Sequence, residues 1–68
     1  MKKYLIICVD ENAKHRFKKI IQKKMKIKRI FDYNNEGDMG FIITSNSDSA
    51  ILKKLSKKHP RQIKVSKL

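Results

Sequence analysis

The sequence predicts a small α+β fold with four β-strands and two α-helices in the order β-α-β-β-α-β. Three observations carry this prediction. Four short apolar segments have the length of strands, two longer lysine-rich segments repeat apolar residues at helical spacing, and a turn signal at residues 34–38 separates the two middle strands. A chain of 68 residues accommodates one such domain, spanning residues 1–68.

The first strand is predicted at residues 3–9, where both faces are apolar, as is typical of a central strand. This interpretation assigns alternate residues to opposite faces, with Leu5, Ile7 and Val9 toward the helices and Tyr4, Ile6 and Cys8 on the open face. Asp10 or Asn12 then caps a helix over residues 11–25, and Asp10 and Glu11 suit its positive N-terminal end. The helix has one apolar face, formed by Ala13, Phe17, Ile20, Ile21 and Met25.

The middle of the chain is predicted to form a hairpin. Residues 27–33 alternate imperfectly and indicate an edge strand or a bulge. Residues 34–38 include Asn, Gly and Asp, which accept the backbone angles of a tight turn. The strand that follows, residues 39–44, is the most apolar central run, and it places Met39, Phe41 and Ile43 on the open face.

The last third of the chain predicts a helix and an edge strand. Ser45 and Asp48 have capping-box spacing, and Pro60 ends the helix. Ile51, Leu52 and Leu55 face inward, whereas Lys53, Lys54, Lys57 and Lys58 face solvent. Residues 62–66 form the fourth strand, with Ile63 and Val65 pointing inward and Lys64 outward. Right-handed crossovers then give a ferredoxin-like sandwich, a four-stranded antiparallel sheet with two helices on one face.

Charge is distributed unevenly along the chain, whose formal net charge is +12. Residues 1–29 carry eleven Lys and Arg against two acids, and residues 53–68 carry seven and no acid. Residues 30–52 carry four acids and no Lys or Arg. A domain this basic is expected to attract polyanions, although a solvated coat of lysines is the alternative.

The sequence contains no set of residues typical of catalysis. It has no phosphate loop and no nucleophile elbow, and His15 and His59 each lie among lysines on a predicted helix. Cys8 is the only cysteine, so an internal disulfide and a zinc cluster are excluded, and we expect no cofactor or metal. The apolar run from Tyr4 is too short to span a membrane or direct export, which predicts a cytoplasmic protein without membrane association.

The predicted open face of the sheet has two interpretations. Tyr4 and Phe41 on the central strands, with Lys64 beside them, could stack and hold the bases of a single strand. The same apolar face could instead bind a second copy of the chain. The sequence favours neither base binding nor self-association at this face over the other.

The chain resembles an RNA recognition motif in three features: the order of its elements, Gly40-Phe41-Ile42 on the third strand, and the ending Ile63-Lys64-Val65. This resemblance implies RNA or single-stranded DNA on the sheet, with Tyr4 and Phe41 stacking bases. The opening run Leu5-Ile6-Ile7-Cys8-Val9-Asp10, followed by a basic helix with Arg16, is similar to small CRISPR-associated ferredoxin-like nucleases. That second resemblance implies that Asp10 binds a metal across a dimer.

We therefore predict a small, non-enzymatic protein that binds RNA or single-stranded DNA mainly through phosphate contacts. The alternatives are a protein-interaction module of the phage or mobile-element type, which uses the apolar sheet face against itself or an acidic protein partner, and a metal-dependent nuclease. The predicted nucleic-acid-binding residues are Tyr4, Lys14, Arg16, Lys18, Lys19, Lys23, Phe41, Lys53, Lys54, Lys57 and Lys64. Helix lysines are expected to set affinity and Phe41 to set strand preference.

Overall fold

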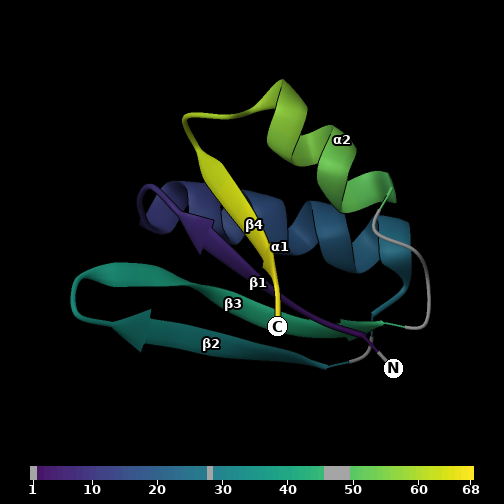
Figure 1. Ribbon diagram of the computed structural model, residues 1–68, viewed down its shortest axis with the longest axis horizontal. Helices are drawn as coiled ribbons and strands as arrows, with labels where there is room; N and C mark the ends of the chain where they lie inside the picture. The colour runs from purple at the N-terminus through teal and green to yellow at the C-terminus, as the bar shows by residue number, and fades with distance from the viewer. Residues whose placement is uncertain (1, 28, 46–49) are drawn as a thin grey trace.

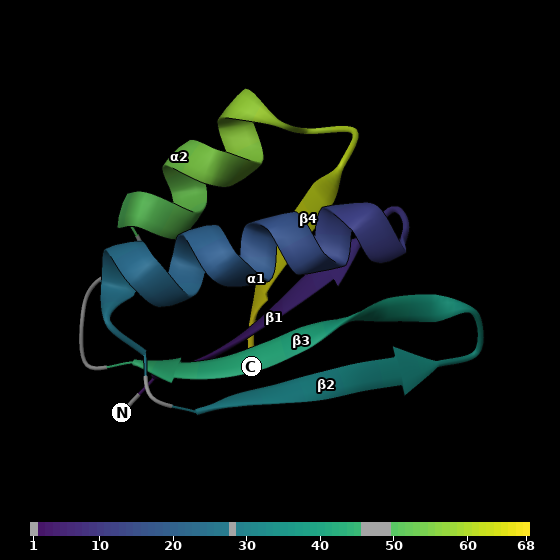
Figure 2. The ribbon, with the colours of Figure 1, turned by 180° about the vertical axis from the view of Figure 1, so that it is seen from behind.

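The computed structural model describes residues 2–27, 29–45 and 50–68, and it shows the predicted order of elements. The elements are β1 (Lys2–Cys8), α1 (Glu11–Met25), β2 (Ile30–Asn35), β3 (Asp38–Ser45), α2 (Ala50–Lys58) and β4 (Ile63–Lys67). The strands form one antiparallel sheet in the order β2-β3-β1-β4. Helix α1 lies behind the strands in Figure 1 and in front of them in Figure 2, so the helices cover one face. The ferredoxin-like α+β prediction is confirmed.

Strand β1 lies at the centre of the sheet, as its two apolar faces predicted. Ile6 pairs with Phe41 of β3 on one side and with Val65 of β4 on the other. Residues paired in this way point to the same face of a sheet. Ile6 and Phe41 are fully buried, and Val65 packs against the same core, so these three side chains face the helices.

The predicted orientation of β1 and β3 was therefore wrong by one residue. Six side chains expected on the open face, namely Tyr4, Ile6, Cys8, Met39, Phe41 and Ile43, lie in the phase that faces the helices. Leu5 and Ile7 point the other way and are half-buried, and Val9, just beyond the strand, is exposed. Both phases of β1 are apolar, so alternation alone did not distinguish them. The buried phase is the one that contains the rings of Tyr4 and Phe41, because burying large aromatic side chains removes the most apolar area from water.

The helices contribute the apolar stripes that their spacing predicted. Buried residues of α1 recur every fourth position, at Ala13, Phe17, Ile21 and Met25. Leu52 and Leu55 are the buried residues of α2. Burial of these stripes removes apolar side chains from water and holds both helices on the sheet, because each fully buried residue of this kind contributes about 1.5–3 kcal/mol.

Strand β2 begins later than the sequence predicted, because α1 ends in a left-handed cap. Lys26 has a φ of 51°, and the amide of Ile27 donates to the carbonyl oxygen of Gln22 over 3.3 Å. Ile27 is buried in the core from this connection rather than from a strand. The apolar character of Ile27 therefore reflects a hydrophobic contact at a helix end, which is common beside such caps.

The hairpin between β2 and β3 has a shorter turn than the five residues, 34–38, that the sequence predicted. Asn35 and Asp38 are paired, and the two residues between them, Glu36 and Gly37, have φ angles of 50° and 90°. Two consecutive positive φ angles characterise the type I′ turn that matches the twist of the flanking strands.

The predicted cap of α2 falls partly outside the described residues. Ser45 is the last residue of β3, and Asp48 lies beyond the part of the chain that the structure describes. The helix ends before Pro60, as predicted, and the amide of His59 donates to the carbonyl oxygen of Leu55 over 2.9 Å. Within the described ranges, neither helix has the length and apolar character that crossing a membrane requires.

Candidate nucleic-acid interface

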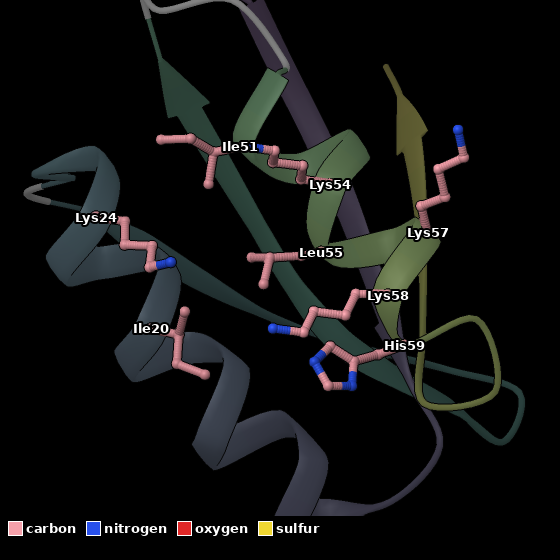
Figure 3. Close-up of a pocket in the computed structure, with 8 residues that line it drawn as sticks. All are labelled: Ile20, Lys24, Ile51, Lys54, Leu55, Lys57, Lys58 and His59. Carbon is pink, nitrogen blue, oxygen red and sulfur yellow. The ribbon is translucent and has the colours of Figure 1, made fainter.

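An open groove of about 950 Å³ separates the two helices on the outer side of the protein. Its apolar lining comes from Ile20 of α1 and from Ile51 and Leu55 of α2, whose side chains point into the space between the helices (Figure 3). The remaining lining residues are cationic or titratable: Lys24, Lys54, Lys57, Lys58 and His59. We call this feature the interhelical groove.

Lysines extend into the interhelical groove from both helices. Figure 3 shows the amino groups of Lys24, from α1, and Lys58, from α2, directed toward each other across it, whereas Lys57 points away. Lys24 and Lys58 lie in the last turns of their helices, where the negative ends of the helix dipoles stabilise cations. The dipoles therefore help to hold like charges close together around an apolar surface.

The lysines of the groove have no acidic partner among the described residues. The ion pairs in this part of the chain join Asp32 of β2 to Lys14, at 3.6 Å, and to Lys18, at 3.1 Å. The hydrogen bond from Lys18, together with the charges of Lys18 and Lys14, holds the pKa of the Asp32 carboxyl below its usual value. Lys14 and Lys18 are therefore partly neutralised on the β2 side of α1, whereas the groove keeps its positive charge.

Four of the five acids among the described residues lie at one end of the molecule. Asp10 caps α1 and Glu11 begins it. Glu36 lies in the hairpin turn and Asp38 begins β3 at the same end of the sheet, because Cys8 pairs with Met39. Figure 1 shows the hairpin turn and the β1–α1 connection on the left, opposite the N-terminus.

The structure separates the predicted lysines into several surfaces. Lys54 and Lys57 line the interhelical groove, and Lys19 and Lys23 are exposed on α1. Lys53 is on the other side of α2, where it lines a second groove of about 410 Å³ with Lys2, Lys67 and three other residues. Lys64 is exposed on β4, on the face of the sheet opposite the helices.

Arg16, Lys24 and His59 have roles in the structure that the sequence interpretation did not assign. The Arg16 guanidinium lies 4.8 Å from the centre of the Phe17 ring and donates to the side chain of Gln62. His59 meets the Phe17 ring edge-on, with centroids 5.0 Å apart, at one end of the interhelical groove. Lys24 was left out of the predicted site, although it lies seven residues after Phe17 and therefore on the same helix face.

The two rings predicted to stack bases are not accessible. Tyr4 is 3% exposed and Phe41 is 0% exposed, and both belong to the core beneath the helices. Base stacking requires an exposed ring face. The resemblance to the RNA recognition motif implied that Tyr4 and Phe41 stack bases on the open face of the sheet. In the structure both rings face the helices instead.

Asp10 has the structural role of a helix cap. Its Oδ1 atom accepts a 2.8 Å hydrogen bond from the amide of Ala13, and its backbone is extended, as at other N-caps. Among the described residues, no three His, Cys, Asp or Glu side chains are grouped closely enough to hold a metal ion. Cys8 is also buried, and burial raises the pKa of its thiol to about 11, so little thiolate is present at neutral pH.

We expect Asp10→Ala to lower the free energy of unfolding by about 0.5–2 kcal/mol, because the amide of Ala13 loses its acceptor. Asp10→Asn is the matched control, since asparagine caps helices about as well without the charge. Urea unfolding followed by circular dichroism measures both variants. An unchanged stability in Asp10→Ala would contradict the capping role. Loss of a metal-dependent cleavage activity in both folded variants would instead support the nuclease interpretation.

The fold and the groove define a class: a small, strongly basic ferredoxin-like protein with a lysine-rich groove between its helices. Comparisons of this chain with protein-family models, curated proteins and solved structures found no match.

Proposed function

We propose that the protein is a non-enzymatic, cytoplasmic nucleic-acid-binding protein that contacts phosphates through the interhelical groove. The observation that carries this proposal is the convergence of Lys24, Lys54 and Lys58 from two helices, with no acidic partner among the described residues. Binding to phosphates releases condensed counterions, and this release supplies most of the non-specific affinity of basic proteins for nucleic acids. Lys19 and Lys23 extend the charged surface along α1.

Fluorescence anisotropy with labelled RNA, single-stranded DNA and duplex DNA tests the proposal. We expect binding that weakens linearly on a logarithmic plot of affinity against salt, with a slope of about −0.7 per phosphate contact for single strands and about −0.9 for duplexes. Lys54→Gln/Lys58→Gln should weaken all three ligands similarly and make the slope shallower by about 1.4 for single strands, because two contacts are lost.

The matched control is Lys14→Gln/Lys18→Gln, which removes the same charge from lysines that already pair with Asp32. We expect this variant to retain most of the slope of the unchanged protein. An equal loss in both double variants would show that net charge, and not the groove, sets the affinity. Absence of binding to all three ligands at about 50 mM salt would refute the proposed function and leave the lysines as a solubilising coat.

A second candidate function is an interaction module for an acidic protein partner. The apolar lining of the interhelical groove, formed by Ile20, Ile51 and Leu55, favours it, because phosphates make no use of such a surface. An amphipathic helix with acids beside its apolar face fits a groove of this composition. Binding of an acidic amphipathic peptide, with no binding to the three nucleic acids, would favour this candidate.

A further inference from the structure

The open face of the sheet carries aromatic side chains that the sequence interpretation did not place there. The Asp32 carboxylate bonds to Lys14 and Lys18 of α1, so Asp32 points toward the helices. Its neighbours in β2, Phe31 and Tyr33, therefore point to the opposite face. Phe31 is 57% exposed and Tyr33 is half-buried, so both rings border solvent.

The register of the strands orders this face into two rows. One row runs from β2 to β4 through Phe31, Ile42, Leu5 and Ser66. The neighbouring row runs through Tyr33, Gly40, Ile7 and Lys64. Gly40 contributes no side chain beside Tyr33, and Gly40 is itself buried.

The dimensions and charges of the two rows suit a single nucleic-acid strand. Phe31 and Tyr33 are two residues apart on one strand, so their Cβ atoms are separated by about 7 Å. That separation leaves room for two unstacked bases of one strand, each against one ring. Lys64 is exposed at the β4 end of one row, and Lys3, also exposed, lies in the same phase of β1 as Leu5 and Ile7. Neither row contains an acid, and Asp38, which pairs with Asn35 in the next row beyond Tyr33, is the acid of the described strands that lies in the same phase.

We infer that the open face of the sheet binds single-stranded RNA or DNA, with Phe31 and Tyr33 stacking on bases and Lys64 and Lys3 contacting phosphates. This inference rests on the proposed function and adds a second surface with a preference for single strands. A second copy of the chain suits this face less well, because each copy carries a net charge of +12 and would bring its own Lys3 and Lys64 to the contact.

Anisotropy titrations of Phe31→Ala and Phe31→Leu with a labelled oligothymidine and with a labelled duplex test this inference. Both variants should lose roughly 5- to 150-fold in affinity for the single strand, the range contributed by one stacked base, and retain duplex affinity. Phe31→Leu keeps an apolar side chain without a ring, so it separates stacking from hydrophobic contact. Circular dichroism confirms that each variant is folded.

Tyrosine fluorescence gives a readout that is independent of affinity. The chain has two tyrosines and no tryptophan, and Tyr4 is buried, so Tyr33 is the tyrosine that reports contacts on the open face. Oligothymidine should quench the tyrosine emission of the unchanged protein. It should leave the emission of Tyr33→Phe unchanged, although this variant keeps a ring and binds the single strand with similar affinity.

Three outcomes would overturn the inference in distinguishable ways. If the protein binds single and double strands but Phe31→Ala changes neither affinity, the proposed function stands and the open face is not a binding surface. If no nucleic acid binds, the proposed function falls and the inference falls with it. If sedimentation shows a dimer that Phe31→Ala dissociates, while binding per folded chain is unchanged, a second copy covers the open face.

Discussion

Gly40→Ala is expected to prevent folding of the protein. A Cβ atom built on Gly40 would overlap the carbonyl oxygen of Ile6 and lie 2.9 Å from its carbonyl carbon and 3.0 Å from Cα of Ile7. All three atoms belong to the backbone of β1, the central strand, and a backbone cannot rotate out of the way as a side chain can. We expect a loss of more than about 3 kcal/mol in the free energy of unfolding, the upper end for an added methyl group.

A loss of that size approaches the total stability of so small a protein, which is about 3–10 kcal/mol for 68 residues. Urea unfolding and circular dichroism measure it. Gly37→Ala is the matched control, since a Cβ at Gly37 meets nothing within 4 Å but must adopt a φ of 90°. We expect that strain to cost only about 1–2 kcal/mol. Equal losses in the two variants would contradict the close approach of β3 to β1.

Phe41→Ala is the second substitution with a large expected effect. Phe41 is fully buried among the core residues between the sheet and the helices. Its truncation leaves a cavity that the surrounding structure fills only in part, which costs about 3–5 kcal/mol. We expect a protein that is unfolded or strongly destabilised at 25 °C, visible as a lowered urea midpoint.

Phe31→Ala is the matched control for Phe41→Ala, because it removes the same side chain from the exposed face of the sheet. We expect it to change the free energy of unfolding by less than about 1 kcal/mol, since its ring already contacts water. If Phe41→Ala folded normally and lost affinity for single strands, the burial of Phe41 would be wrong and the original stacking prediction would be restored. The pair of variants therefore separates core packing from nucleic-acid binding.

The interhelical groove and the open face lie on opposite sides of the sheet, and in the proposed binding mode they would contribute different energies. The lysines of the interhelical groove would act through charge, which is strong at low salt and insensitive to base identity. Phe31 and Tyr33 would act through stacking, which depends little on salt and requires unpaired bases. A protein with both surfaces would therefore retain a preference for single strands when salt has weakened the lysine contacts.

The sequence by itself determined the order of elements, because each element depends on local patterns. The apolar spacing of Phe17, Ile21 and Met25 specifies a helical face. Asp10 specifies a cap, and Gly37 permits the positive φ of the hairpin turn. Once the order β-α-β-β-α-β is known, few topologies remain, since crossover connections are right-handed. The concentration of lysines on the helices was equally visible from spacing.

Only the tertiary structure decided which face of each strand is buried. In β1, Tyr4 and Ile6 alternate with Leu5 and Ile7, so both phases are apolar and a shift of one residue exchanges the core face for the open face. The choice depends on how β1, β3 and β4 pair and on which phase fills the space under α1, and those contacts join residues far apart in the chain. The same long-range pairing placed Phe41 in the core, left Phe31 exposed and brought Asp32 to Lys14 and Lys18, whose charges it partly neutralises.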